Sequence, residues 1–259
     1  MAWQRRLGWA WDRLGRDNAL GAILTKDGRV AEWTLEEFLA TGRADADKFA
    51  ADLQRIAPSA RRESLLDFGC GVGRVTRGLA AHFRTVVGMD VARSMIERAR
   101  ELHAGCPGCS FVINRSTRLR TIADGRFDVV YCRLVLQHIR PVLVRQYIPE
   151  LVRVLAPGGV LMFQLPEVIA VDPVQAFEDA PVTGGFVKKN LPRPILIAWR
   201  RLKYLAVAPD PGARMDMFGI NRPDVEAIVA QAGGRLIAVT PDDGHGEIGR
   251  GFGYWVTPS

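Results

Sequence analysis

The sequence lacks any run of about 20 apolar residues, so it offers no segment for a helix that spans a membrane. Its first 20 residues, MAWQRRLGWAWDRLGRDNAL, lack the uninterrupted apolar stretch of a secretory signal peptide. Four cysteines in 259 residues are too few for a disulfide framework. These absences predict a soluble protein that stays in the reducing cytoplasm.

Long basic runs are also missing, although Lys and Arg outnumber Asp and Glu by 35 to 28 and the formal net charge is +7. The densest basic clusters are adjacent pairs at residues 5–6, 61–62, 188–189 and 200–201. Such scattering predicts a basic surface and disfavours nucleic acid as the partner. Peripheral contact with an anionic membrane stays open.

Short apolar runs alternate with helix-like segments from residue 64 onward. The runs are SLLDF, TVVGMD, SFVIN, FDVVYC and GVLMFQL, and the helix-like segments cover residues 75–82, 92–103 and 143–155. Strands that are buried on both faces and alternate with helices are typical of a doubly wound parallel α/β sheet. A helix at residues 222–231 and two further strands, RLIAVT and GFGYWVT, complete a Rossmann-like sheet of seven strands.

Three parts follow from this pattern. Residues 1–60 form an N-terminal helical layer, with helices expected at residues 4–14 and 34–39 and in RADADKFAADLQRIA. Thr34 and Glu37 have the spacing of a capping box at the second of these helices. Residues 61–166 and 220–259 form the sheet domain, and residues 167–219 form a helical insertion after the fifth strand. The insertion is a lid over a bound substrate, a patch that meets an anionic or lipid-linked substrate, or a helix packed on the sheet.

The segment LLDFGCGVGRVT carries glycine at every second position, at Gly69, Gly71 and Gly73. It lies between a predicted strand and a predicted helix, where main-chain N–H groups can meet a ligand at the carboxyl end of a sheet. The spacing differs from the G-x-G-x-x-G of dinucleotide enzymes, because Arg74 stands where the last glycine would be.

Asp90 ends the second predicted strand. An acidic residue at this place can accept hydrogen bonds from both hydroxyls of a ribose. The glycine segment carries no P-loop lysine for phosphates. The combination indicates a nucleoside with a small charged tail.

In these features the sequence resembles the class I S-adenosylmethionine-dependent methyltransferases. Four segments carry the resemblance in order, namely LDFGCGVGRVT, VVGMDVARSMIERAR, FDVVYCRLVLQHI and LVRVLAPGGVLMFQLP. The resemblance covers residues 38–166 closely and the last two strands loosely. It implies S-adenosyl-L-methionine as the cofactor, and as the acceptor a hydroxyl or amine of a small biosynthetic intermediate (a natural product, a sugar or a lipid-linked compound).

The resemblance also implies a set of cofactor-binding residues. They are Asp67, Gly69, Gly71, Gly73, Asp90, Val91, Met95, Asn114, Arg115, Cys132 and Gln137. Gly69 and Gly71 would line the methionine part, Asp67 would order the loop, and Asp90 would hold the ribose. Val91 and Met95 would flank the adenine. Asn114 stands where the family often has an aspartate, and its amide can still hydrogen-bond adenine.

His138 follows the fourth strand and is the candidate catalytic base, since an imidazole can accept a proton near neutral pH. The alternative is that it orients the loop or contacts the cofactor. With His138, the residues expected to contact the acceptor are Trp199 and Tyr204 of the insertion. Two other histidines have ordinary explanations: His245 is expected in solvent and His82 near the end of a helix.

Other interpretations stay open. HAGCPGC places His103, Cys106 and Cys109 at spacings that invite zinc, but one C-x-x-C without a second pair is half a site, so no metal is expected. The net charge motivates an RNA or protein methyltransferase as the second enzyme reading. A non-catalytic cofactor-binding protein is the third, and the chain is expected as a monomer or homodimer.

Overall fold

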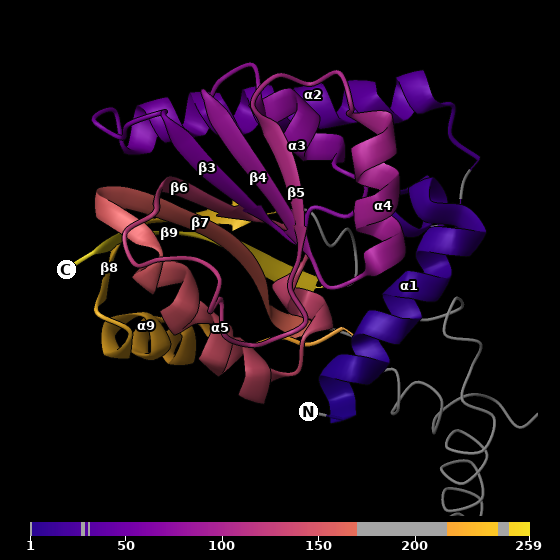
Figure 1. Cartoon of the computed structure of the whole chain (residues 1–259). Helices are drawn as coiled ribbons and strands as arrows, with labels where there is room; N and C mark the ends of the chain where they lie inside the picture. Colours follow the sequence, from indigo (N-terminus) through magenta and orange to yellow (C-terminus); the bar gives the residue numbers. More distant parts are fainter. Residues whose placement is uncertain (1, 27–28, 31, 170–216, 243–248) are drawn as a thin grey trace, which may run out of the picture.

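A computed structural model describes residues 2–26, 29–30, 32–169, 217–242 and 249–259. Its centre is a sheet of seven strands in the order β5-β4-β3-β6-β7-β9-β8 (Figure 1). The strands are β3 (Ser64–Phe68), β4 (Thr85–Asp90), β5 (Cys109–Ile113), β6 (Phe127–Cys132), β7 (Leu155–Ile169), β8 (Gly234–Asp242) and β9 (Gly249–Pro258). Neighbours from β5 to β7 are parallel, whereas β9 is antiparallel to both β7 and β8. The predicted Rossmann-like fold is confirmed.

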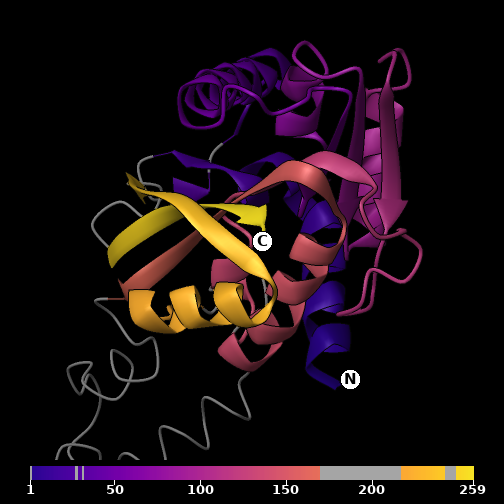
Figure 2. The same ribbon diagram turned by 90° about the vertical axis from the view of Figure 1, so that its left-hand side faces the viewer.

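Helices cover both faces of the sheet. They are α1 (Ala2–Ile23), α2 (Leu35–Ile56), α3 (Arg74–Leu79), α4 (Arg93–Leu102), α5 (Pro141–Arg153) and α9 (Arg222–Gln231). Figures 1 and 2 show α5 and α9 on one side of the sheet and α2 on the opposite side. Two adjacent residues of β3 face these two layers. Leu66 packs in a hydrophobic cluster with residues of α5 and α9, and Leu65 packs in another cluster with residues of α2. Both are fully buried, as a strand between two helical layers requires.

The predicted helix at residues 34–39 and the predicted helix in RADADKFAADLQRIA are one continuous helix, α2. Its capping box is present, with Thr34 Oγ1 accepting from Glu37 N and Glu37 Oε2 accepting from Thr34 N. Gly42 lies within this helix, at a place where a Cβ would be 2.2 Å from the carbonyl oxygen of Arg74. The glycine therefore permits close packing of α2 on α3. A hairpin that the sequence did not predict, β1 (Thr25–Lys26) and β2 (Arg29–Val30), precedes α2.

Most of the predicted insertion at residues 167–219 lies outside the described residues, namely residues 170–216, which include Trp199 and Tyr204. Its two ends are described. β7 extends to Ile169, and Ile220 N donates to Pro166 O at 2.9 Å. Of the helices within the described ranges, none is long and apolar enough to cross a membrane.

Candidate functional site

The sheet reverses its strand order between β3 and β6, and the loop after β3 lies at this point. Gly69, Gly71 and Gly73 all have positive φ, at 81°, 55° and 81°. A Cβ on Gly69 would lie 2.3 Å from Val135 Cγ2, and one on Gly71 would lie 2.7 Å from Ile23 Cδ1. Backbone conformation and lack of space both require glycine here. The crevice at such a reversal is where open α/β sheets bind ligands.

Asp90 ties the end of β4 to this glycine loop. Its Oδ2 accepts a hydrogen bond from Gly71 N at 2.9 Å, and its Oδ1 accepts one from Ala92 N at 2.9 Å. Burial raises the pKa of Asp90, and the two N–H donors oppose that shift. A carboxylate has about four acceptor positions, so two donors leave capacity for a ligand hydroxyl.

Asp67 lies beneath the loop at the end of β3. Its side chain is buried, and Thr76 in the first turn of α3 donates to Asp67 Oδ2 at 2.6 Å. Burial raises the pKa of Asp67 from 3.8 to about 6, against the lowering effects of the Thr76 hydrogen bond and of Arg74. The bond joins the strand and the helix that flank the glycines.

Two residues expected beside the adenine lie against α1. A Cβ on Gly8 would be 3.2 Å from Val91 Cγ2, and one on Gly15 would be 3.3 Å from Met95 Cγ. Met95 is buried, and Val91 follows β4 directly. The small residues of α1 therefore let this helix approach the segment after β4 closely.

Asn114 and Arg115 follow β5, and both side chains have partners in the chain. Asn114 Nδ2 donates to Ser116 O at 2.8 Å, and Ser116 N donates to Asn114 Oδ1 at 3.3 Å. Arg115 Nη2 lies 3.0 Å from Asp12 Oδ2. Asn114 thus shapes its own loop, and Arg115 reaches from the sheet edge to α1.

The sequence did not identify α1 as part of this site. Asp12 accepts hydrogen bonds from Ser94 N at 2.9 Å and from Ser94 Oγ at 3.3 Å at the start of α4. Figure 1 shows α1 alongside α4, next to the carboxyl ends of the strands. The tryptophan-rich N-terminal segment was the available signal, because exposed aromatics on an amphipathic helix indicate a surface to be covered.

His138 ends the short 3-10 helix η1 (Leu136–His138) after β6. Its ring lies 5.7 Å from the ring of Trp11, edge to face at 73°. Gln137 Nε2 lies 3.2 Å from His138 Nε2, so the amide can donate to that ring nitrogen. Within the described part of the chain, the buried Gln137 Oε1 has no hydrogen-bond partner. Phe218 N donates to Gln137 O at 2.7 Å, which brings the end of the insertion to this place.

The chain between β6 and η1 is held in an unusual conformation. Leu134 has a φ of 60°, which is rare for leucine. Its N–H donates to the side-chain oxygen of Gln164 at 3.0 Å, and Gln164 is fully buried in β7. Leu134 and Gln164 therefore fix the path that leads to His138, a positioning role that sequence reasoning missed.

Cys132, at the end of β6, is fully buried in the core, where burial raises the pKa of its thiol.

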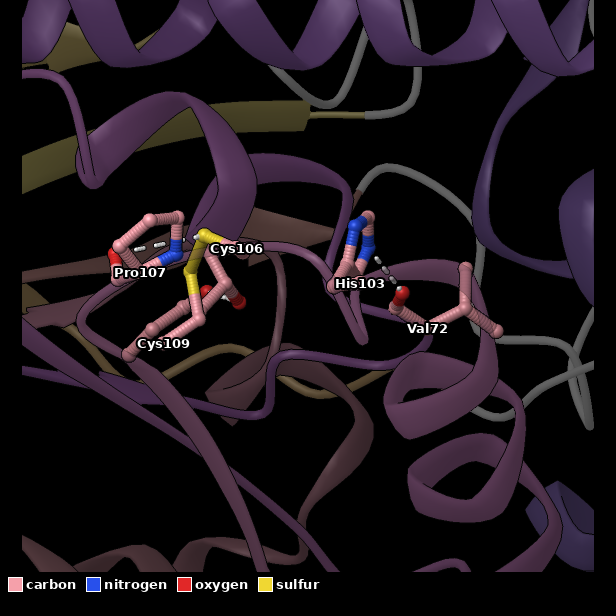
Figure 3. The surroundings of a disulfide bond; sticks show 7 residues. Val72, His103, Cys106, Pro107 and Cys109 are labelled. Carbon is pink, nitrogen blue, oxygen red and sulfur yellow. Dashed lines mark hydrogen bonds between the residues drawn. A yellow bond between two sulfur atoms is a disulfide. The ribbon is translucent and has the colours of Figure 1, made fainter.

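The cysteines correct one expectation. Cys106 and Cys109 form a disulfide (Figure 3), although the sequence predicted reduced thiols. The reason is local: Pro107 and Gly108 form a tight turn, with Gly108 at a φ of 80°, and the two cysteine Cα atoms lie 5.5 Å apart. The sulfurs of the suggested half zinc site are thus bonded to each other.

The remaining histidines lie elsewhere. His82 lies in the turn after α3, and its Nε2 is 2.6 Å from Asp47 Oδ1, so it joins this turn to α2. His245 lies outside the described residues.

Comparisons with known proteins agree on one domain. Residues 66–163 match the family model for a methyltransferase domain. The chain is 30% identical over 170 residues to phosphoethanolamine N-methyltransferase 3 of Arabidopsis thaliana, which covers 60% of this chain and 33% of the relative. It is 32% identical over 138 residues to trans-aconitate 2-methyltransferase of Methylobacterium radiotolerans, which covers 52% of this chain and 50% of the relative. The matches thus span a third to a half of the length of these relatives.

Solved structures share the fold. Magnesium protoporphyrin IX methyltransferase from Synechocystis PCC 6803, solved with bound SAH, has a TM-score of 0.62, with 14% identity and 99% of both chains covered. A SAM-dependent methyltransferase from Leishmania major has a TM-score of 0.60 and 13% identity, with 98% of this chain and 83% of that chain covered. At such identities the likeness concerns the fold.

Proposed function

Because the chain carries a class I S-adenosylmethionine-dependent methyltransferase domain, we propose that it transfers a methyl group from S-adenosyl-L-methionine to a hydroxyl or amine of a small biosynthetic intermediate. The observation that carries the proposal is the bond from Gly71 N to Asp90 Oδ2, 2.9 Å long, at the reversal point of the sheet. It sets a glycine loop and an acidic strand end side by side, as recognition of a nucleoside requires. The similar curated methyltransferases are named for small acceptors such as phosphoethanolamine and trans-aconitate.

In this proposal the cofactor lies across the carboxyl ends of β3 and β4. Asp90 accepts hydrogen bonds from the ribose hydroxyls, and the main chain at Gly69 and Gly71 lines the methionine part. Val91 and Met95 supply the apolar surface for the adenine, with Asn114 and Arg115 beyond them. The bound cofactor supplies an electrophilic methyl group on a sulfonium. α1 covers these residues, because Gly8 and Gly15 allow it to lie close to Val91 and Met95.

The acceptor approaches from the loop after β6, where His138 and Gln137 lie together. The unpartnered Gln137 Oε1 is suited to accept a hydrogen bond from an acceptor hydroxyl or ammonium group, because an unpaired buried oxygen is costly. His138 removes the proton of the nucleophile when that group is poorly ionised, and Trp11 forms an aromatic wall beside it. If no proton needs removal, alignment of the nucleophile with the methyl group is the main catalytic device.

The proposal divides the chain as the sequence suggested. Residues 1–60 form a helical layer that covers the cofactor, and residues 61–166 and 220–259 form the cofactor domain. We keep as part of the proposal that residues 167–219, with Trp199 and Tyr204, contribute to the acceptor site, although residues 170–216 lie outside the described ranges. The hydrogen bond from Phe218 N to Gln137 O supports this placement of the insertion's end. The cytoplasmic location and the choice between monomer and homodimer stay predictions from the sequence.

Three measurements test the function. Calorimetry with S-adenosylhomocysteine should show binding to the purified chain, and ligand extracted from the purified protein should be identified by mass spectrometry. A panel of small hydroxyl and amine compounds, assayed by release of S-adenosylhomocysteine, should contain a substrate. A folded chain that binds neither form of the cofactor would contradict the proposal. Turnover confined to RNA or protein acceptors would replace the small-molecule assignment.

A further inference from the structure

The disulfide closes a turn between α4 and β5. Cys109 N donates to Cys106 O at 3.3 Å across the turn, and Gly108 has the positive φ that the third residue of a type II turn requires. Pro107 and Gly108 are exposed, Cys109 is half-buried and Cys106 is buried. The bond therefore lies at the surface, with the Cys109 side more accessible.

Each side of this turn carries an aromatic ring. On the α4 side, His103 O accepts a hydrogen bond from Cys106 N at 2.9 Å. On the β5 side, Phe111 lies two residues after Cys109. The rings of His103 and Phe111 stack with centroids 5.6 Å apart and planes at 26°. The disulfide thus links the two segments that carry these stacked rings.

The two rings support the glycine loop directly. His103 Nε2 donates to Val72 O at 3.0 Å, as Figure 3 shows. A Cβ on Gly73 would lie 2.8 Å from His103 Cδ2 and 2.8 Å from Phe111 Cε1, so the loop has no gap beneath it. Burial lowers the pKa of His103, which favours a neutral ring that donates from Nε2. Val72 is the neighbour of Gly71, whose N–H binds Asp90.

We propose that Cys106 and Cys109 are a redox-active pair that controls cofactor binding. When the pair is oxidised, it holds His103 and Phe111 under the glycine loop. When it is reduced, hydrogen bonds and packing alone hold the connection between α4 and β5, so the support of the loop weakens and affinity for the cofactor falls. This inference rests on the proposed function, because it concerns the regulation of that same site.

The reductant would be a small dithiol or a dithiol protein. Its thiolate attacks Cys109 Sγ, the S–S bond breaks, and Cys106 leaves as a thiolate that takes up a proton. The second thiol of the reductant then attacks the mixed disulfide, releases Cys109 as a thiol, and leaves with the reductant oxidised. Two electrons and two protons pass to the protein. Cys70 and Cys132 are buried with raised thiol pKa values, so they are poor competitors in this exchange.

The experiment compares the full chain before and after treatment with dithiothreitol. Alkylation of the denatured protein followed by intact mass should count two thiols before treatment, on Cys70 and Cys132, and four after it. Calorimetric titration with S-adenosylhomocysteine should then show affinity about fivefold or more weaker in the reduced form, the size of a typical coupling between sites.

Variants separate coupling from nonspecific effects of the reductant. The double variant C106S/C109S should bind with the affinity of the reduced form and ignore dithiothreitol. His103→Ala should also bind weakly and lose the redox response, because it removes the bond to Val72. Gly105→Ala is the matched control: Gly105 precedes Cys106 in the same connection between α4 and β5, has open space around it, and should keep the full response when changed.

Each alternative outcome is decisive. Equal, measurable affinity in both verified redox states would overturn the coupling and leave the proposed function intact. Absence of binding in both states would contradict the proposed function itself. Four thiols before treatment would overturn the disulfide. If the double variant does not fold, the comparison of the two states of the unmodified chain still decides.

Discussion

The carboxylate of Asp90 accepts a hydrogen bond from the main-chain N–H of Gly71 at 2.9 Å, which joins the end of β4 to the loop after β3. Asp90 ends β4, and Gly71 lies in the loop that follows the neighbouring parallel strand β3, so the sheet brings the two segments together. A ligand that bonds to Asp90 therefore meets the glycine loop already in place, and little order has to be gained on binding.

Asp90→Ala should weaken binding of S-adenosylhomocysteine by roughly 30-fold to 1,000-fold, or about 2–4 kcal/mol. The change removes the acceptor for the ribose hydroxyls and also the anchor of the Gly71 amide. Calorimetry on the folded variant measures the loss. Glu97→Ala is the control, since Glu97 is an exposed carboxylate on α4 that pairs with Arg93. Unchanged affinity in folded Asp90→Ala would remove Asp90 from the site.

Gly42→Ala should destabilise the fold by about 1–3 kcal/mol, as overpacking of a close contact usually does. A Cβ there would lie 2.2 Å from Arg74 O, which is main chain and cannot turn aside. Urea unfolding gives the free energy. The matched change Gly105→Ala meets nothing within 4 Å and should stay within about 0.5 kcal/mol. Equal stability of the two variants would argue against close packing of α2 on α3.

Much of the sheet could be predicted from sequence, because strands buried on both faces are short apolar runs whatever they contact. SLLDF and FDVVYC coincide with β3 and β6 for this reason. Contacts between segments that are distant in the sequence produce no comparable pattern of apolar residues. The bond of Asp12 to Ser94 spans 82 positions, and nothing near either residue indicates the other.

Arg74 is a second residue whose contacts could not be predicted from the sequence. The sequence marked it only as the residue that replaces a glycine. In the structure its guanidinium is buried, 2.7 Å from Asp45 and 3.1 Å from Thr41 of α2. The spacing of the motif shows that a glycine is replaced at this position. The role of the arginine depends on the helix that packs against it, which the spacing does not reveal.

Asp67 should make stability depend on pH between about 4 and 6. Its native pKa, about 6, lies above the ordinary 3.8, so the folded chain binds this proton more tightly than the unfolded chain does. Stability from this group is therefore present at low pH and is lost as pH rises through that window, by about 3 kcal/mol at about 1.4 kcal/mol per pKa unit.

Asp67→Asn stays neutral and can still accept from Thr76 through its amide oxygen. Its free energy of unfolding relative to the unmodified chain should therefore rise by about 2 kcal/mol between pH 4 and pH 6.5, the part of the total change that falls in this range. Urea unfolding at several pH values measures the difference. A flat difference for Asp67→Asn would mean that the pKa of Asp67 is not raised.

His138→Ala should lower turnover of the identified acceptor by roughly 100-fold to 10,000-fold if the imidazole removes the acceptor proton. Affinity for S-adenosylhomocysteine should change by less than about twofold, because His138 lies beside Trp11 and Gln137, whereas the proposal assigns the cofactor to Asp90 and the glycine loop. His82→Ala, whose imidazole joins α2 at Asp47, is the matched control and should keep full turnover. A loss that lies in cofactor affinity would make His138 a cofactor contact. A small loss in turnover alone would mean that alignment of the acceptor by Gln137 and the neighbouring side chains is the source of the rate. Methyl transfer from a sulfonium to an already ionised nucleophile needs correct positioning of the nucleophile but no base.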